Sequence, residues 1–218
     1  MLRLILHYLY SFVFCLRYLP LRQALHVPIL IHFSVKVRNL PRGAVSFSTK
    51  LRHGMLVVGF DGSAGLSNCQ SLICIKPGGR LVVGSNVQMA KGTRIVIEER
   101  GVLSIGSHFW CNGDCFFHCT KRITIGDHNM YGWSVHFNTS DGHHVYENGA
   151  PKPMEGDITI GNHVWIAAYC HIAKNAAITA NCIVAQNSLV NKMFTKAECL
   201  IGGIPAKVIK ENVTWSAD

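Results

Sequence analysis

No aspartate or glutamate occurs in the first 60 residues of this 218-residue chain. The same segment carries eight basic residues: Arg3, Arg17, Arg22, Lys36, Arg38, Arg42, Lys50 and Arg52. After residue 60 thirteen bases meet twelve acids, so the net charge of +9 belongs almost entirely to the N-terminal segment. This imbalance favours an anionic membrane surface or an anionic polymer as a neighbour. Because no nucleic-acid recognition motif accompanies the bases, we do not expect nucleic acid as a partner.

The nine cysteines include no C-x-x-C pair, and the N-terminus lacks a signal-peptide cleavage pattern. Both features are typical of reduced cysteines in a cytoplasmic protein. Cys111 and Cys115 stand four residues apart in the chain. We predict that both fill the core as small apolar side chains, and metal binding is the alternative.

The chain also lacks an uninterrupted apolar run long enough to cross a bilayer. Residues 1–19 are strongly apolar, but Arg3, His7, Ser11 and Arg17 interrupt them. The first three of these residues are spaced by four, which places them on one face of a helix that Pro20 ends. Two readings stay open for this helix. It packs on the rest of the protein, or it lies in a membrane interface, which would make the protein peripheral on the inner face of the membrane.

The most regular pattern in the chain is a period of six between residues 157 and 193. Its leading positions are β-branched aliphatics: Ile160, Ile166, Ile172, Ile178, Val184 and Val190. The residue three positions after a leader is a candidate for a corner between strands. Three of these residues are asparagine, which tolerates left-handed backbone better than most residues. The five positions are His163, Tyr169, Asn175, Asn181 and Asn187. Compact residues follow: Val164, Cys170, Ala176, Cys182 and Ser188. A strand and a corner repeated every six residues predict an all-β, three-sided parallel β-helix with coils of about eighteen residues.

Weaker copies of this period extend towards the N-terminus and define three segments. We expect a basic apolar segment over residues 1–52, a β-helix over 53–195 and a short C-terminal tail over 196–218. Residues 139–157 interrupt the β-helix with nineteen residues that have no period. Long excursions of this kind are usually functional or disordered. The excursion contains the pair His143 and His144.

Three motifs give the sequence a family resemblance: SDGHHVY at 140–146, IGNHVWIA at 160–167 and GIPAK at 203–207. In this order they resemble the hexapeptide-repeat acyltransferases over roughly residues 80–210, and most closely the galactoside-type and capsular-polysaccharide O-acetyltransferases. The resemblance implies a left-handed parallel β-helix, a homotrimer with sites between subunits, acetyl-CoA as co-substrate and a sugar or polysaccharide acceptor. It implies no metal.

The resemblance assigns the general base to His143. A sugar hydroxyl is a poor nucleophile until its proton is removed, and an imidazole with a pKa of about 6.5 can accept that proton near neutral pH. His144 is the alternative base. Asp141 or Asp114 could fix the imidazole tautomer, and a backbone carbonyl would serve as well.

Further site residues follow from the same resemblance. Asn112 matches an asparagine near the acceptor, although a structural asparagine at a corner is an equal alternative. Trp165 matches an active-site tryptophan, which could also pack between subunits. The small residues Ala167 and Ala185 would border the pantetheine arm, whereas Lys192 and Lys207 would meet the phosphates of coenzyme A or remain solvated.

The histidine spacing argues against one other enzyme class with the same scaffold. The γ-class carbonic anhydrases share the scaffold but need an H-x-x-x-x-H pair, and no two of the twelve histidines are five apart. A non-catalytic trimeric scaffold and a serine-acetyltransferase-like enzyme with a small acceptor remain alternatives.

Overall fold

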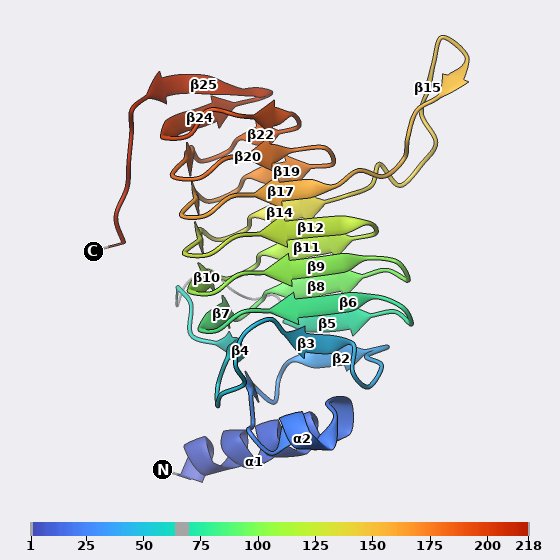
Figure 1. Cartoon of the computed structure of the whole chain (residues 1–218), viewed down its shortest axis with the longest axis vertical. Coiled ribbons are helices and arrows are strands. Elements are labelled where there is room, and N and C mark those ends of the chain that lie inside the picture. The colour runs from blue at the N-terminus through green and yellow to red at the C-terminus, as the bar shows by residue number, and fades with distance from the viewer. Residues whose placement is uncertain (1, 64–69, 218) are drawn as a thin grey trace.

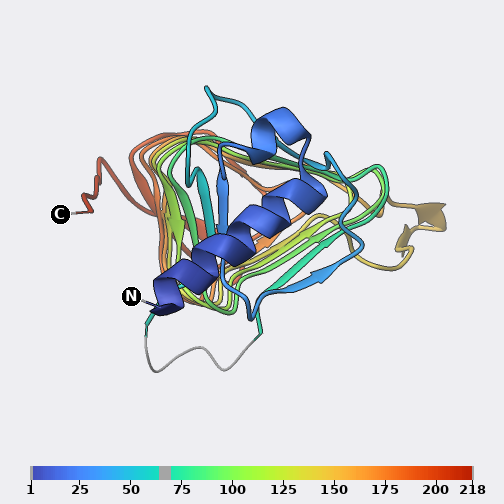
Figure 2. The same ribbon diagram turned by 90° about the horizontal axis from the view of Figure 1, so that it is seen from below.

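The protein is a three-sided stack of short parallel strands, with one helix across its N-terminal end (Figure 1). The computed structural model describes residues 2–63 and 70–217, with side chains from Ile5 onward. Viewed along the stack, the coils superimpose into a triangular outline that α1 crosses (Figure 2). The parallel β-helix architecture predicted from the repeat is therefore present.

Side A is a nine-stranded sheet. In spatial order it contains β1 (Ile29–Ile31), β4 (Leu56–Phe60), β7 (Val87–Ala90), β10 (Phe109–Cys111), β13 (Met130–Tyr131), β18 (Trp165–Ile166), β21 (Ile183–Val184), β24 (Cys199–Gly203) and β25 (Ala206–Glu211). All neighbours are parallel except the last pair, in which β25 turns back antiparallel on β24.

Sides B and C have seven strands each. Side B contains β2 (Lys36–Arg38), β5 (Leu72–Ile75), β8 (Arg94–Ile97), β11 (Phe116–Cys119), β14 (His136–Asn138), β19 (His171–Ala173) and β22 (Leu189–Val190). Side C contains β3 (Val45–Phe47), β6 (Arg80–Val83), β9 (Val102–Ile105), β12 (Arg122–Ile125), β17 (Ile158–Ile160), β20 (Ala177–Ile178) and β23 (Met193–Phe194).

The hexapeptide positions have the roles that the sequence predicted. The leading aliphatics from Ile160 to Val190 are all buried, and so are the compact residues from Val164 to Ser188. All five predicted corner residues have a positive φ of 54–65°. Such backbone is costly for most residues and least costly for asparagine, which explains its recurrence at these positions. Cys111 and Cys115 are fully buried, and burial raises the pKa of the Cys115 thiol well above its usual range.

The β-helix extends beyond the boundaries expected from the sequence. Its first coil begins at Ile29 rather than near residue 53, because β1, β2 and β3 pair with β4, β5 and β6. It also continues past residue 195, since β24 pairs in parallel with β21. In both regions strand pairing continues although the six-residue spacing does not.

The helix α1 (Leu2–Tyr18) packs against β1 and is followed by the short α2 (Leu21–Ala24). Ser11 fixes this contact, because its hydroxyl accepts a hydrogen bond from the Ile31 N–H at 3.0 Å. Phe14, Cys15 and Leu19 are buried on the same side. Of the two readings of this helix, packing on the β-helix is therefore observed. None of the described helices is long and apolar enough to span a membrane.

Candidate active site

The excursion at residues 139–157 is a hairpin that stands away from the stack (Figure 1). Its tip is an antiparallel pair of strands, β15 (Tyr146–Glu147) and β16 (Ala150–Pro151), and a bridge between Ser140 and Glu155 closes its root. His143 lies between root and tip, and its side chain is exposed. The imidazole is therefore held on an ordered element and is accessible to a substrate.

Lys174 ties the two sides of the hairpin root together. Its ammonium lies 2.6 Å from the Asp141 carboxylate and donates to the Pro153 carbonyl at 2.5 Å. Its side chain is only 18% exposed, so water screens these contacts incompletely. Asp141 thus anchors the hairpin through Lys174, and its predicted role in orienting His143 stays a prediction. The sequence reasoning missed Lys174, because nothing in the repeat pattern marks it.

A column of small residues runs along the corner between sides A and B. The residue just before each column position pairs with its counterpart in the next coil. These pairs are Cys111 with Tyr131, Tyr131 with Ile166, Ile166 with Val184 and Val184 with Ile201. The column itself is therefore Asn112, Gly132, Ala167, Ala185 and Gly202, one residue per coil. At its upper end Gly202 pairs with Lys207 of β25. These five positions thus lie in one column, and three of them, Asn112, Ala167 and Ala185, are predicted site residues.

A shallow cavity of about 250 Å³ opens beside this column. Asn112, Ala167 and Trp165 all line it, so the structure brings these three predicted residues together. Trp110 and Trp133 line the same cavity and were not identified from the sequence. The small side chains at its floor leave room for a narrow extended chain, which fits the pantetheine arm of coenzyme A. We expect larger side chains at Ala167 to fill this space.

Asn112 itself is committed to local structure. Its side-chain oxygen accepts from the backbone N–H groups of Ser63 and Gly113 at 3.1 and 2.8 Å. Its amide donates to the Ser63 hydroxyl at 3.0 Å. The left-handed corner of this coil is Asp114, with a φ of 62°, rather than Asn112. Asn112 therefore shapes the cavity wall, and a direct contact with the acceptor stays a prediction.

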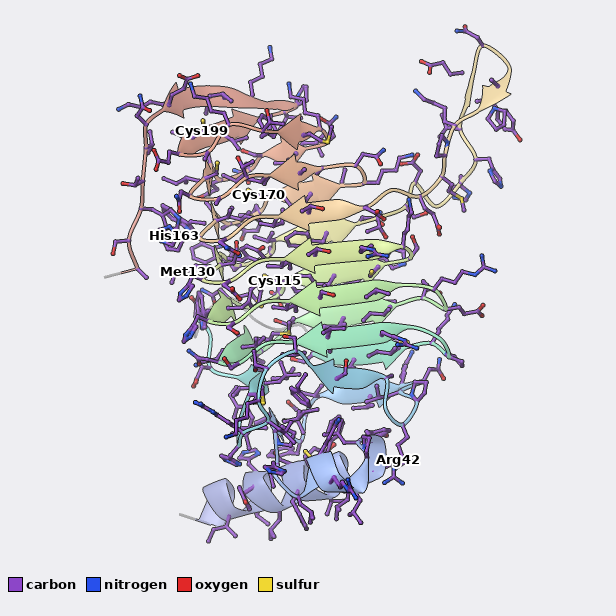
Figure 3. All side chains as sticks on the ribbon, in the orientation of Figure 1. Arg42, Cys115, Met130, His163, Cys170 and Cys199 are labelled. Carbon is purple, nitrogen blue, oxygen red and sulfur yellow. The ribbon has the colours of Figure 1, made fainter. Side chains whose placement is uncertain are left out.

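The outer face of side A carries large aromatic side chains. Trp165 is 38% exposed, and the pairings place it above Met130, which in turn lies above Trp110. The C-terminal tail adds Trp215, whose ring stacks on His163 at 4.4 Å and whose indole N–H donates to the His163 carbonyl. His163 and Met130 are labelled on this side in Figure 3, where the tail descends along the stack. All four tryptophans of the chain thus lie on or beside this face.

The remaining predicted residues lie at another edge. The hairpin leaves β14 of side B and returns to β17 of side C, so His143 projects from the corner between these sides. Lys192 also lies between sides B and C, where its ammonium is 5.4 Å from the centre of the Phe194 ring. In Figure 1 the hairpin and β10 are on opposite sides of the stack. Within one chain, His143 and Lys192 therefore form one group, while Asn112, Trp165, Ala167, Ala185 and Lys207 form another.

The root contact of Lys174 provides a test of hairpin positioning. If His143 acts from this hairpin, Lys174→Met should lower turnover about tenfold, because it removes a charge-assisted hydrogen bond. The KM for acetyl-CoA should change little, and Lys174→Arg should restore part of the rate. The matched control is Lys196→Met, which removes an exposed ion pair with Glu211 outside the hairpin. Equal losses in both variants would contradict a specific role for Lys174.

Comparison with known proteins places this geometry in a family. Residues 157–192 match the family described as bacterial transferase hexapeptide (six repeats). An uncharacterized 24.8 kDa protein of the cps region of Klebsiella pneumoniae is 32% identical over 205 residues, covering 91% of this chain and 86% of that protein. A polysialic acid O-acetyltransferase of Escherichia coli O1:K1 is 28% identical, covering 62% of this chain and 42% of that protein. The galactoside O-acetyltransferase of Escherichia coli K12 is 29% identical, covering 50% and 54%. The chain thus spans about half the length of these two enzymes.

Solved structures share the architecture. A polySia-specific acetyltransferase superimposes with a TM-score of 0.50 at 20% identity, covering 87% of this chain and 89% of that one. An N-acyltransferase from Bacillus cereus, in complex with dTDP and 3-hydroxybutyryl-CoA, gives 0.52 at 15% identity and covers 84% and 80%. At these identities the likeness concerns the fold alone. Together with the repeat and the Klebsiella pneumoniae relative, it shows that the chain belongs to the bacterial hexapeptide-repeat transferases and has their left-handed parallel β-helix.

Proposed function

We propose that the protein is an O-acetyltransferase that moves an acetyl group from acetyl-CoA to a hydroxyl of a sugar or polysaccharide. The observation that carries this proposal is the column of small residues beside Trp165, with Lys207 at its upper end. A column of small residues beside a cavity, with a basic residue at its upper end, suits the extended pantetheine arm and the phosphates of coenzyme A. The relatives with named activities are O-acetyltransferases of polysialic acid and of galactosides, which supports a sugar acceptor.

In this reaction acetyl-CoA supplies an activated thioester carbonyl. His143 accepts the proton of the acceptor hydroxyl while the hydroxyl oxygen bonds to the carbonyl carbon. The carbon–sulfur bond breaks, and the imidazolium returns its proton to the leaving sulfur. The residues of this chain thus bind, orient and move one proton, which is sufficient because the thioester is already reactive.

The site is expected to form between copies of the chain. His143 and Lys192 project from one corner of the stack, whereas the groove with Trp165 and Ala167 lies at another. A second copy that presents its hairpin to this groove would complete the site, and a closed threefold ring would repeat the contact three times. Aromatic side chains such as Trp165 and Tyr169 are exposed on the single chain, and burying them between copies would favour such a homotrimer.

The acceptor surface favours a saccharide over a small amino acid. Tryptophan rings border the cavity beside Ala167, where the acceptor would meet the thioester end of the pantetheine arm. Aromatic side chains offer apolar contact area to a sugar ring, and a cavity open to solvent admits a chain that extends beyond the site. A free amino acid would instead require an enclosed pocket with charged groups for its ammonium and carboxylate.

The proposal is tested by incubating the purified protein with acetyl-CoA and a panel of glycans. Release of the free thiol and formation of a base-labile acetyl ester are the expected results. Thermal-shift measurements with coenzyme A separate the alternatives, because a non-catalytic scaffold would show no stabilisation. Ester formation on serine but on no glycan would favour the serine-acetyltransferase-like alternative.

A further inference from the structure

The outward face of α1 is apolar, although the helix packs on the β-helix with its other face. Ile5, Leu6, Leu9 and Val13 are 50, 54, 53 and 61% exposed. Nearby at the same end of the stack, Leu21, Leu25 and Phe33 are also about 60% exposed. Contiguous apolar side chains of this size on a protein surface usually mark an interaction site.

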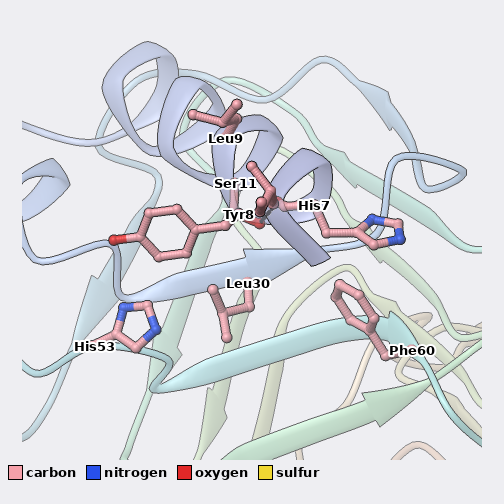
Figure 4. A pocket seen from close by; sticks show the side chains of 8 residues that line it. His7, Tyr8, Leu9, Ser11, Leu30, His53 and Phe60 are labelled. Atoms are coloured by element: carbon pink, nitrogen blue, oxygen red, sulfur yellow. Dashed lines mark hydrogen bonds between the residues drawn. The ribbon is translucent and has the colours of Figure 1, made fainter. Parts of the chain in front are cut away.

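A hollow between α1 and the first coils enlarges this surface (Figure 4). It has a volume of about 470 Å³, and Leu30 and Phe60 of the first coils line it. From the helix, the Tyr8 ring lies 5.7 Å from the His53 ring and the His7 ring lies 5.2 Å from the Phe60 ring. Exposed Ile5 and Leu9 border both the hollow and the outward face. The apolar surface therefore continues from the helix into the end of the stack.

The helices and the first coil, which carry this apolar surface, also carry many exposed bases. Seven of the eight N-terminal bases have described side chains, and all seven are exposed: Arg17, Arg22, Lys36, Arg38, Arg42, Lys50 and Arg52. None of the seven forms an ion pair with a described residue. The first acid of the chain is Asp61, so no carboxylate side chain in this segment offsets their charge. Arg42 is labelled beside the helices at this end in Figure 3.

We propose that this N-terminal cap, residues 5–52, binds the surface of a membrane that contains anionic lipids. An amphipathic helix with an apolar outer face and surrounding bases lies in the headgroup region rather than across the bilayer. Its exposed bases meet lipid phosphates, and each contributes attraction near an anionic surface. A second copy of the cap does not fit as the occupant, because it would bring two acid-free basic surfaces together. The proposal is independent of the proposed transferase activity.

Flotation of the full-length protein with lipid vesicles tests this inference. Vesicles of phosphatidylcholine alone are compared with vesicles of phosphatidylcholine and phosphatidylglycerol. We expect binding to the mixed vesicles that weakens as salt is raised, and little binding to phosphatidylcholine alone. Equal flotation with both lipids, or no flotation with either, would overturn the proposal.

Two sets of variants separate the apolar and basic contributions. Leu9→Ser with Val13→Ser should weaken binding about tenfold or more, because two exposed side chains lose their apolar surface. The triple change Arg38→Gln, Lys50→Gln and Arg52→Gln should weaken it on the order of 100-fold. Melting temperatures should stay near the wild-type value, since all five side chains are exposed.

Matched controls make the same changes elsewhere on the stack. Val208→Ser with Ile209→Ser alters two exposed apolar residues on β25, at the opposite end from α1 (Figure 1). Arg80→Gln, Arg100→Gln and Arg122→Gln remove three exposed bases outside the cap. Both controls should float like the wild type. Losses as large as those of the cap variants would show that binding is not a property of the cap.

Discussion

Replacing His143 by alanine is expected to lower acetyl transfer about 10²–10⁴-fold, which is the usual contribution of a general base. The side chain is exposed on a hairpin and fills no part of the buried core. The melting temperature should therefore remain unchanged. Coenzyme A should still bind, because its proposed contacts come from the small-residue column and Lys207. Steady-state kinetics, thermal shift and coenzyme titration measure these three results on one preparation.

His144→Ala is the matched control, since this neighbour is equally exposed on the same hairpin. It should retain most of the turnover. Loss of activity in His144→Ala with retention in His143→Ala would move the assignment by one residue. Activity in both variants would contradict a base on this hairpin.

The largest loss of stability is expected from Phe137→Ala, at about 3–5 kcal/mol. Phe137 is fully buried and stacks on Phe117 with ring centres 5.0 Å apart. It also lies 5.4 Å from the ring of Tyr131, so its removal leaves a cavity in the middle of the stack. Urea unfolding followed by circular dichroism measures the change in the free energy of unfolding. Phe33→Ala is the control, because Phe33 is 60% exposed and should change that free energy by less than about 0.5 kcal/mol. Similar losses in both variants would contradict an interior held by this ladder.

The sequence predicted the coils well wherever each coil repeats in eighteen residues. Ile160, Ile166 and Ile172 lead three successive sides because a strand and a corner recur without insertions. The same logic failed for the first coil, β1 to β3. There the strands begin at unequal intervals, at Ile29, Lys36 and Val45, and the positive-φ residues Asn39 and Gly43 are only four positions apart. No period of six is therefore visible, although the strands still pair.

The adjacency of the column residues is visible only in the structure. Gly132 and Ala167 are neighbours in the column but 35 positions apart, because the hairpin separates their coils. Their adjacency follows from the pairing of Tyr131 with Ile166. The sequence pattern does not predict this pairing, because the insertion at residues 139–157 interrupts the period between the two strands. The contact of Lys174 with Asp141 was hidden for the same reason, since it depends on how the hairpin returns to the stack.

The most direct test of a site shared between copies mixes two inactive variants. Ala167→Trp should be inactive because the indole fills the cavity, and His143→Ala should be inactive because the base is missing. Co-expressed in equal amounts, they should assemble into mixed trimers with about one quarter of the wild-type activity, since a working site needs one particular variant on each side. Separately purified variants that cannot exchange subunits should stay inactive after mixing. The contradicting result is a set of trimers that contain both chains but are no more active than the separate variants. Such trimers would exclude a site built from His143 of one copy and the cavity beside Ala167 of another.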